Sequence, residues 1–369
     1  MTAASVAAIS DWVRIESPSH DAAGVNAMMD AVAQDVAGHS INVERVAGRE
    51  GLGDALILRA GPQNGQPQVV VLSHLDTVHP RGMIDGALKL RIEGDRLYGP
   101  GVYDMKGGAW LALQAFKDVV ASGALRRPAV FLFSPDEEIG SPTSRPLIES
   151  LSRGGVAALV TEPARMGGRI VTARKGTAAF EITVEGRAAH AGVNHDKGRS
   201  AIREAAHQIL ALEAMTDYAT GTTINVGVIT GGSGVNTVPQ FAHLRIDGRV
   251  ATMAEGEALV RRVLALQPQT PDTTLTIRGS LNRPPYEKTE GVAALFETAQ
   301  SLAAEIGLAL EDCPMTGGGS DGNFSAALGV PTLDGLGIDG DGAHTPMEHA
   351  LISSIAPRRA LMTALLRTL

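Results

Sequence analysis

The stretch VVVLSHLDTV, residues 69–78, is an apolar run that leads into a histidine and an aspartate. Its first four residues are typical of a buried strand. Similar apolar runs occur later in the chain, at residues 129–133, 156–160 and 330–336. Amphipathic stretches alternate with these runs, and one of them predicts a helix directly after Lys106-Gly107-Gly108. This alternation predicts an α/β sandwich.

Residues that can bind a metal ion directly follow three of the predicted strands. His74 follows the first strand, Glu137 and Glu138 follow the second, and Glu162 follows the third. In open α/β sheets, ligands bind beyond the carboxyl ends of the strands. The sequence therefore predicts that these four side chains gather at one edge of the sheet.

The middle of the chain has a different pattern. Residues 180–185 alternate apolar and polar side chains, as a half-buried antiparallel strand does. The following pattern predicts, in order, a helix from near Ser200, strands at 222–228 and 244–250, a helix at 255–266 and a strand at 274–278. The order β-α-β-β-α-β is ferredoxin-like. We therefore predict an inserted domain at residues 175–285, with a first domain formed by residues 1–174 and 286–369.

Composition limits the possible classes of function. The length of 369 residues favours two domains, and the net charge of -8 without a Lys/Arg cluster argues against nucleic-acid binding. The apolar runs are far shorter than the ~20 residues of a membrane span. The N-terminus lacks the basic region of a secretory signal, and the single cysteine, Cys313, cannot form an internal disulfide. We expect a cytoplasmic protein with neither a nucleic-acid partner nor a membrane partner.

Three short motifs contain residues that could bind metal or take part in catalysis. Asp76 can accept a hydrogen bond from the far ring nitrogen of His74 and so orient the ring. Asp104 lies in GPGVYDMKGG, where glycines allow close approach of the backbone. Glu137 and Glu138 repel each other unless a cation separates their roles, so one can bind metal while the other acts as a base. Taken singly, each motif also fits a surface contact or a solvated turn.

Nine segments, in order along the chain, resemble the M20 family of zinc aminoacylases and carboxypeptidases, and most of all its bacterial glutamate carboxypeptidases. The segments are SHLDTV, GPGVYDMKGG, PDEEIGS, TEP, GRAAHAG, GVNTVP, NRPP, GGGSDG and GAHT. The resemblance implies a mixed-sheet α/β catalytic domain with an inserted ferredoxin-like α+β domain that serves as a lid and as a dimerisation surface. It also implies hydrolysis of an amide bond in a short peptide or acyl-amino acid, with release of a C-terminal residue that we expect to be glutamate.

The resemblance assigns a role to each candidate residue. Two Zn²⁺ ions would share five ligands, with Asp104 as the bridge, His74 and Glu162 at one site, and Glu138 and His344 at the other. Glu137 would act as the general base, taking a proton from the activated water and passing it to the leaving amine. Co²⁺ and Mn²⁺ suit the same ligands. A cis peptide bond is implied between Asp104 and Met105.

Substrate recognition is implied to depend on the inserted domain. His190, in GRAAHAG, resembles the histidine that family dimers extend into the partner's site to stabilise the oxyanion, so a homodimer would be required. Arg283 would pair with the substrate carboxylate, helped by Asn236 and by backbone groups of Gly318, Gly319 and Ser320. The alternatives are an ordinary surface histidine for His190 and a hinge salt bridge for Arg283.

Other readings stay open or fail. An N-acyl-amino-acid deacylase, of the acetylornithine deacetylase or succinyl-diaminopimelate desuccinylase type, has the same chemistry and stays open. A non-catalytic binding protein is disfavoured because no ligand or base is missing. A calcium loop at residues 339–350 lacks its glycine and its final acid, and no H-E-x-x-H is present. We expect Glu348 and His349 to cap or solvate a helix that begins nearby.

Overall fold

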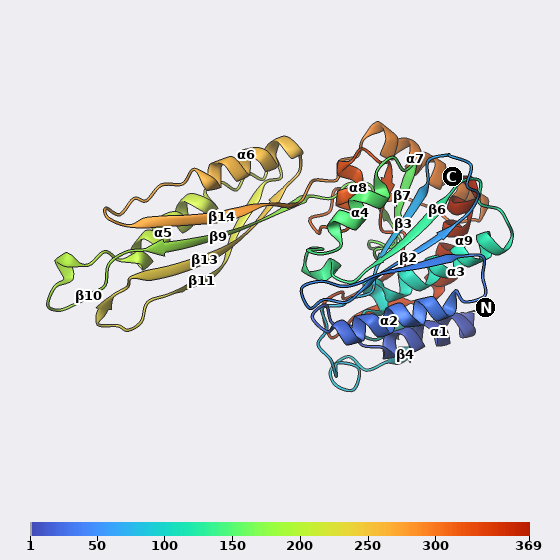
Figure 1. Ribbon diagram of the computed structural model, residues 1–369, viewed down its shortest axis with the longest axis horizontal. Coiled ribbons are helices and arrows are strands. Elements are labelled where there is room, and N and C mark those ends of the chain that lie inside the picture. The colour runs from blue at the N-terminus through green and yellow to red at the C-terminus, as the bar shows by residue number, and fades with distance from the viewer. Residues whose placement is uncertain (1) are drawn as a thin grey trace. The chain divides into compact units, whose positions relative to one another are not determined.

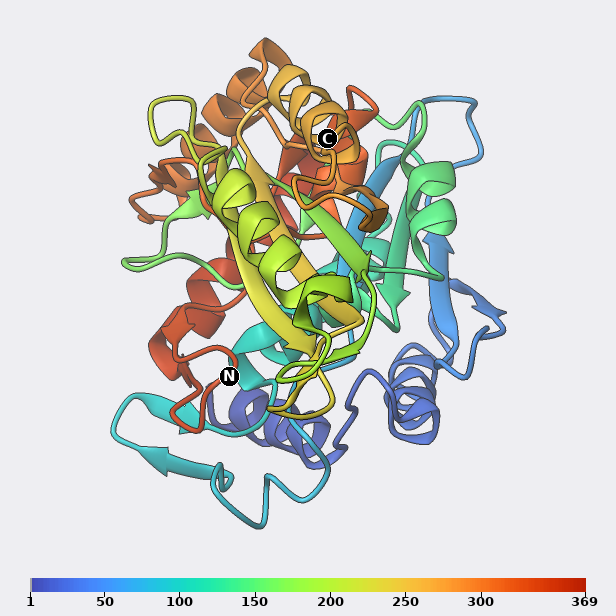
Figure 2. The same cartoon turned by 90° about the vertical axis from the view of Figure 1, so that its left-hand side faces the viewer.

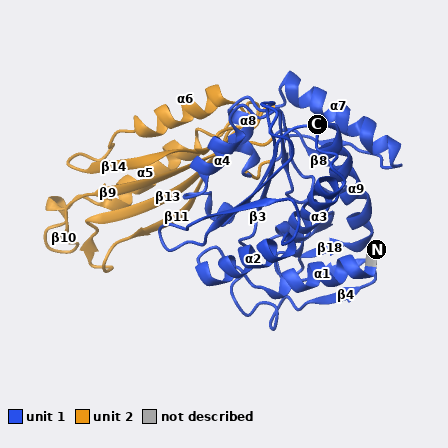
Figure 3. Cartoon of the chain, turned by 45° about the vertical axis from the view of Figure 1, so that its right-hand side comes forward, with its two compact units in different colours: residues 1–173, 288–316, 320–369 blue, residues 174–287, 317–319 orange. Residues whose placement is uncertain are grey.

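The computed structural model describes residues 2–369 (Figure 1). The described chain divides into two compact units, which Figure 3 shows in different colours. Unit 2 consists of Arg174–Glu287 and Gly317–Gly319, and unit 1 consists of the remaining described residues. The short segment Gly317–Gly319 groups with unit 2 although it lies outside the range 175–285 that the sequence indicated.

Unit 1 is built on a mixed sheet whose described strands follow the order β1-β2-β6-β3-β7-β16. β3 runs parallel to β6 and β7, and β16 runs parallel to β7, whereas β2 is antiparallel to both β1 and β6. The bounds are β1 Asn42–Val46, β2 Ala55–Ala60, β3 Val69–His74, β6 Ala129–Ser134, β7 Ala157–Val160 and β16 Thr332–Leu333. This arrangement confirms the mixed α/β fold that the resemblance implied.

Helices cover both faces of this sheet because its central strands are apolar on both sides. On one face, Val71 and Phe131 pack in a core with α1, α3 and α9, and on the other face, Leu72 and Leu132 pack with α4 and α8. The helices of unit 1 are α1 Thr2–Arg14, α2 Ala22–Asp35, α3 Gly107–Ala121, α4 Arg145–Ser152, α7 Glu290–Glu305, α8 Gly322–Ala327 and α9 Ile352–Thr368. Its shorter strands are β4 Arg91–Glu93, β5 Arg96–Tyr98, β8 Ile170–Val171, β15 Asp312–Cys313, β17 Gly340–Asp341 and β18 His349–Leu351.

The strand predicted at residues 330–336 is shorter in the structure. Only Thr332–Leu333 pairs with β7 as a ladder. The next residue, Asp334, pairs instead with Val171, and Gly335 has a φ of 67°. The ladder is therefore interrupted at Asp334 and Gly335, and the Leu336 N–H then donates to the Val160 carbonyl of β7 at 3.1 Å.

Unit 2 contains an antiparallel sheet of order β11-β13-β9-β14, with α5 and α6 packed on one face (Figure 2). The elements are β9 Gly176–Glu185, α5 Ala201–Glu213, β11 Thr223–Gly231, β13 Phe241–Val250, α6 Met253–Leu264 and β14 Thr274–Arg283. β9 alternates buried and exposed residues along its length. α5 begins where the sequence indicated, because the Ser200 side chain accepts a hydrogen bond from the Arg203 N–H and so caps the helix. A separate short pair joins β10 Ala189–His190 to β12 Thr237–Val238.

The two ends of the long segment of unit 2 lie side by side. The Arg174 N–H donates to the Tyr286 carbonyl at 2.8 Å, and the Tyr286 N–H donates to the Arg174 carbonyl at 3.0 Å. One pair of backbone hydrogen bonds thus joins the first and last parts of this segment. No helix within residues 2–369 is both long and apolar enough to cross a membrane.

Candidate metal centre

Asp104 lies in the segment Val102–Lys106, directly before α3. The peptide bond between Asp104 and Met105 is cis, which confirms the bond implied by the resemblance. The first turn of α3 lies against the end of β7, since a Cβ added at Gly108 would lie 2.2 Å from the Thr161 carbonyl oxygen. Glycine at this position therefore allows the Asp104 segment to approach the strand end that precedes another predicted ligand.

The two carboxylate oxygens of Asp104 face two different histidines. Oδ1 lies 3.3 Å from Nε2 of His74, and Oδ2 lies 3.4 Å from Nε2 of His344. The side chain of Asp104 is 14% exposed. A carboxylate oriented in this way can contact one metal ion through each oxygen.

Acidic side chains complete the surroundings of each histidine. His74 Nε2 lies 3.6 Å from Oε1 of Glu162 and 4.0 Å from Oε2 of Glu137. His344 Nε2 lies 3.1 Å from Oε2 of Glu138. The structure therefore brings together all six residues that the sequence singled out for metal binding and base catalysis: His74, Asp104, Glu137, Glu138, Glu162 and His344.

The cluster fits a pair of divalent metal ions. Within residues 2–369, three of its buried atoms have no hydrogen bond of normal geometry: His74 Nε2, Asp104 Oδ1 and Glu138 Oε1. Buried polar atoms are ordinarily hydrogen-bonded, so these three atoms are suited to contact with a cation. Ligand atoms from two overlapping sets, His74-Asp104-Glu138 and His74-Glu137-Glu162, lie within 4.8 Å of one another in each set. Imidazole nitrogen and carboxylate oxygen are donors that zinc accepts.

The surrounding carboxylates keep both histidines protonated when no metal is bound. Burial alone lowers the pKa of His74, but the neighbouring carboxylates of Asp104 and Asp76 outweigh burial and hold it well above its usual value. Asp104 and Glu138 raise the pKa of His344 to about 11. Burial raises the pKa of Asp104, but His344 and His74 lower it further, so it falls below its usual value. A metal ion must therefore displace protons from this site.

Asp76 holds the turn that carries the paired glutamates. Its buried carboxylate accepts the N–H of Glu137 and the N–H of Glu138, each at 3.1 Å, and the Ser19 hydroxyl at 2.7 Å. His74 Nδ1 lies 3.0 Å from the Asp76 backbone oxygen and 3.3 Å from Oδ1. Asp76 therefore contacts the far nitrogen of His74 as expected, and it also fixes the glutamate turn, which the sequence did not indicate.

Two further aspartates support the same turn, and the sequence reasoning missed both. Asp136 accepts hydrogen bonds from the backbone and the hydroxyl of Thr143, both at 2.7 Å. Asp321 accepts the Ser134 hydroxyl at 2.7 Å and also the Ser141 hydroxyl. These bonds fix the chain on both sides of the glutamates. The available signal was their place in PDEEIGS and GGGSDG, two of the segments that carry the resemblance.

The prediction that Glu348 and His349 cap or solvate a helix is wrong. Glu348 is 1% exposed, and its Oε1 accepts the N–H of Tyr103 at 2.9 Å and the N–H of Asp104 at 3.1 Å. Its Oε2 contacts Nε2 of His79. His349 begins β18. The polar sequence around Glu348 suggested solvent exposure, but in the structure Glu348 is buried against the backbone of Tyr103 and Asp104.

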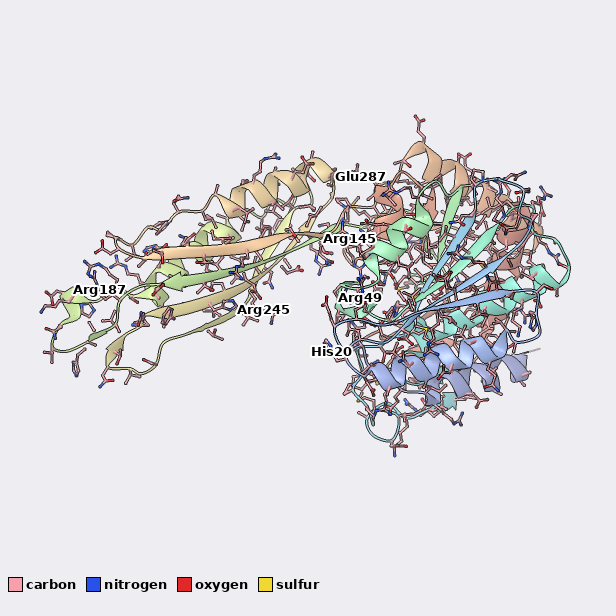
Figure 4. All side chains as sticks on the ribbon, viewed as in Figure 1. His20, Arg49, Arg145, Arg187, Arg245 and Glu287 are labelled. Atoms are coloured by element: carbon pink, nitrogen blue, oxygen red, sulfur yellow. The ribbon has the colours of Figure 1, made fainter. Side chains whose placement is uncertain are left out.

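His190 and Asn236 are neighbours in unit 2. The N–H of Ala191 donates to the Asn236 carbonyl at 2.9 Å, and both predicted side chains are exposed. Arg187, labelled in Figure 4, marks the end of unit 2 that carries them. The N–H of Gly192 donates to His190 Nδ1 at 3.1 Å, so neutral His190 carries its proton on Nε2. That nitrogen can donate a hydrogen bond.

Arg283 ends β14 and is 4% exposed. A Cβ added at Gly319 would lie 2.7 Å from Cδ of Arg283, so the glycine admits this side chain. The carbonyl of Gly318 accepts a hydrogen bond from Arg174 Nη1 at 3.1 Å. The structure thus brings Gly318 and Gly319 together with arginines of unit 2.

Ser320 differs from the glycines that precede it. It belongs to unit 1 and is completely buried. Its N–H donates to Asn323 Oδ1 at 2.9 Å, and its hydroxyl donates to Asp334. Both of its donor groups therefore have protein acceptors.

Known proteins resemble the chain in sequence and in structure. A match to peptidase family M20/M25/M40 spans residues 70–368. Carboxypeptidase G2 of Pseudomonas sp. (strain RS-16) is 30% identical over 359 residues, covering 95% of this chain and 86% of that protein. Acetylornithine deacetylase of Myxococcus xanthus is 30% identical over 240 residues, covering 62% and 58% of the two chains. The solved structure of aminopeptidase PepT from Bacillus cereus ATCC 10987 has a TM-score of 0.78 at 23% identity, over 100% of this chain and 98% of that one.

The family match covers most of the chain, including every residue of the His74–His344 cluster. The match to carboxypeptidase G2, at 30% identity, extends over nearly the whole chain. The chain therefore belongs to peptidase family M20/M25/M40, which confirms the resemblance seen in the sequence.

Proposed function

We propose that this chain is a two-metal amide hydrolase that releases a C-terminal amino acid from a short peptide or an N-acyl substrate. One observation carries the proposal: the two oxygens of Asp104 face His74 and His344 separately, at 3.3 and 3.4 Å. This orientation suits a bridge between two cations. Glu137 Oε2 lies 4.0 Å from Nε2 of His74, and the proposal leaves Glu137 outside the ligand set so that it can act as the base.

The proposed ligand set follows the family resemblance, and the distances within the cluster support it. Asp104 would be shared, His74 and Glu162 would hold one ion, and Glu138 and His344 would hold the other. Two bound Zn²⁺ ions, or Co²⁺ or Mn²⁺, would polarise the scissile carbonyl and lower the pKa of the attacking water.

Glu137 is the proposed general base. It takes a proton from the attacking water and delivers it to the leaving nitrogen. Asp76 fixes the backbone of Glu137 at 3.1 Å, which keeps the carboxylate in one place during both transfers.

Residues of unit 2 are proposed to recognise the substrate. His190 presents a donor nitrogen, Nε2, which suits stabilisation of a tetrahedral oxyanion in the partner subunit's site. The guanidinium of Arg283 is planar and suits a substrate carboxylate, with Asn236 and backbone groups of Gly318 and Gly319 as further contacts. Both backbone groups of Ser320 are bonded to Asn323, at 2.9 and 3.1 Å, so the substrate contact expected of Ser320 is not part of this proposal.

C-terminal glutamate is the proposed leaving residue. The nine segments shared with bacterial glutamate carboxypeptidases support it, as does the 30% identity to carboxypeptidase G2 over 95% of the chain. The second candidate is an N-acyl-amino-acid deacylase, and the 30% identity to acetylornithine deacetylase over 62% of the chain favours it.

A substrate panel separates the two candidates. The metal-loaded enzyme is incubated with acyl-glutamates, acyl-ornithine and succinyl-diaminopimelate, and products are identified by mass spectrometry. Release of glutamate without turnover of the other two supports the first candidate, and the reverse pattern supports the second. Glu137→Gln serves as the inactive control, and equal turnover by this variant would contradict the proposed mechanism.

We also propose a homodimer formed through unit 2. β11 is an edge strand of its sheet, and the side chains of Val228 and Ile229 on it are 43% and 50% exposed. Leu210 on α5 is 70% exposed. Unpaired edges with exposed apolar side chains favour association. Light scattering should show a dimer that Ile229→Lys converts to a monomer, and a wild-type monomer would contradict the proposal.

A cytoplasmic location is proposed on the basis of the thiol content. Cys313 is the single cysteine of the sequence, so the chain has no internal disulfide. This usage fits a reducing compartment. Cell fractionation with antibody detection would test the location.

A further inference from the structure

A buried carboxylate outside the proposed ligand set contacts the backbone of the proposed bridge. Glu348 Oε1 accepts the N–H groups of Tyr103 and Asp104 at 2.9 and 3.1 Å, and its Oε2 contacts His79 Nε2. Glu348 is 1% exposed and His79 is 5% exposed. These groups are therefore shielded from water. Hydrogen bonds to a charged acceptor are strong in such a buried place.

These contacts join three separate parts of unit 1. His79 follows β3, the strand that ends in His74, and Asp104 precedes α3. Glu348 lies four residues after His344, on the same connection between β17 and β18. One carboxylate thus links the chain segments of both proposed histidine ligands to the segment of the proposed bridge.

The backbone N–H of Asp104 sets where its side chain begins. If Glu348 were removed, the N–H groups of Tyr103 and Asp104 would lose their acceptor, which is unfavourable where water cannot replace it. The segment would move to find other partners, and the two Asp104 oxygens would leave their present distances from the two histidines. Displacement of one ligand lowers the affinity for metal, because an ion must contact all of its ligands at the same time.

We infer that Glu348, held by His79, is a positioning residue that sets the Asp104 bridge relative to the two histidine ligands and so determines the affinity of the centre for metal. The inference rests on the proposed function, since it takes Asp104 as the bridge. Glu348 acts through the Asp104 backbone and touches neither substrate nor metal.

Unit 2 contains a matched control for this role. Glu204 is completely buried and accepts the consecutive N–H groups of Gln269 and Thr270, at 3.0 and 2.6 Å. It also accepts a side-chain donor, Gln208 Nε2, at 2.6 Å. Glu204 therefore makes the same kinds of hydrogen bond as Glu348, but in a unit that contains none of the proposed metal ligands.

The test measures metal binding directly. The full chain and the variants Glu348→Ala, Glu348→Gln, His79→Ala and Glu204→Ala are stripped with a chelator and titrated with Zn²⁺, and bound metal is counted by mass spectrometry. We expect Glu348→Ala to weaken metal binding about 10–100-fold. Glu348→Gln keeps one acceptor oxygen and should weaken it less, and Glu204→Ala should lower the melting temperature without changing the metal affinity. In the loaded enzyme, kcat should fall for Glu348→Ala with KM unchanged.

The possible outcomes distinguish failure of the inference about Glu348 from failure of the proposed two-metal function. A Glu348→Ala variant that is destabilised like Glu204→Ala but binds two ions with wild-type affinity would overturn the inference. If Glu348→Ala does not fold, wild-type metal affinity in both Glu348→Gln and His79→Ala would overturn it. A wild-type chain that binds no metal would instead contradict the proposed function on which the inference rests.

Discussion

His74 and His344 contact opposite oxygens of one carboxylate but are held by different kinds of structure. His74 ends β3 in the middle of the sheet of unit 1, and its side chain is 1% exposed. His344 lies in the connection between β17 and β18, and its side chain is 52% exposed. Its φ of 65° is uncommon for a residue other than glycine. The sheet fixes the first histidine, whereas a surface loop must hold the second.

The difference has a consequence for the proposed metal pair. The buried position, with His74 and Glu162, is formed by residues at or just after the ends of β3 and β7. The exposed position, with His344 and Glu138, includes one ligand that water can reach. We therefore expect the two ions to bind with different affinities and to exchange at different rates.

Asp104→Ala should have the largest effect, because it removes the ligand that both positions share. We expect activity to fall by at least about 10⁴-fold, as several kcal/mol of charge stabilisation depend on the ions. Metal content should fall at both positions. Asp95→Ala, which removes a surface carboxylate bound to the Ser353 backbone, is the control and should change neither quantity. Loss of only one ion from Asp104→Ala would disprove the bridge.

Glu137→Gln separates catalysis from metal binding. A general base contributes about 10²–10⁴-fold, so kcat should fall by that factor. Metal content should stay at two ions per chain, because the side chain is not in the proposed ligand set. Metal analysis of the purified variant together with steady-state kinetics measures both. An ion lost with the activity would show that Glu137 is a ligand.

Replacing each histidine in turn tests the contrast directly. His74→Ala leaves buried carboxylates without their main cationic partner, so we expect the metal-free protein to lose about 1–3 kcal/mol of unfolding free energy. His344→Ala removes a half-exposed side chain and should change the free energy of unfolding less. Each variant should keep one ion. Chemical denaturation and metal analysis give the two readouts, and equal destabilisation would mean that burial does not distinguish the positions.

The pH dependence of metal binding should be the smallest of these effects. The folded, metal-free protein raises the pKa of His344 to about 11, well above the usual value of 6.5, so the ring is protonated at neutral pH. Metal binding must release that proton, and apparent affinity should rise with pH by about tenfold per unit for each proton displaced. Calorimetry in buffers of different ionisation enthalpy counts the released protons. Binding without proton release would contradict the raised pKa.

The same shift affects the metal-free protein. A raised pKa stabilises the folded state below the unfolded value of 6.5, and this contribution disappears as pH rises through about 11. Because the His344 side chain is half exposed, solvent screening keeps the contribution small.

The sequence predicted the buried strands and the candidate ligands that follow them, because both depend on local patterns. Apolar runs located β3, β6 and β7, and the residues after them predicted where candidate ligands gather. The edge strand β1 gave no such signal, because four of its five residues are exposed and show no apolar alternation. Strand prediction from periodicity depends on burial, which an edge strand lacks.

Long-range contacts explain what the sequence could not supply. Nothing near Glu348 in the chain indicates that it meets Tyr103 and Asp104, which lie some 245 positions earlier. The same holds for Asp321, whose hydroxyl partners lie in another part of the chain. A buried acid is recognised by its partners, and these are set by the tertiary fold.

The backbone pair between Arg174 and Tyr286 has a consequence for how the gene for such a protein can change. Because the two ends of the inserted segment are already joined, closing this long loop costs the host sheet little chain entropy. We therefore expect that the segment can be exchanged between homologues with the strand order of unit 1 intact. Gly317–Gly319 belong to the same unit, so a successful chimaera must carry that short stretch from the same parent.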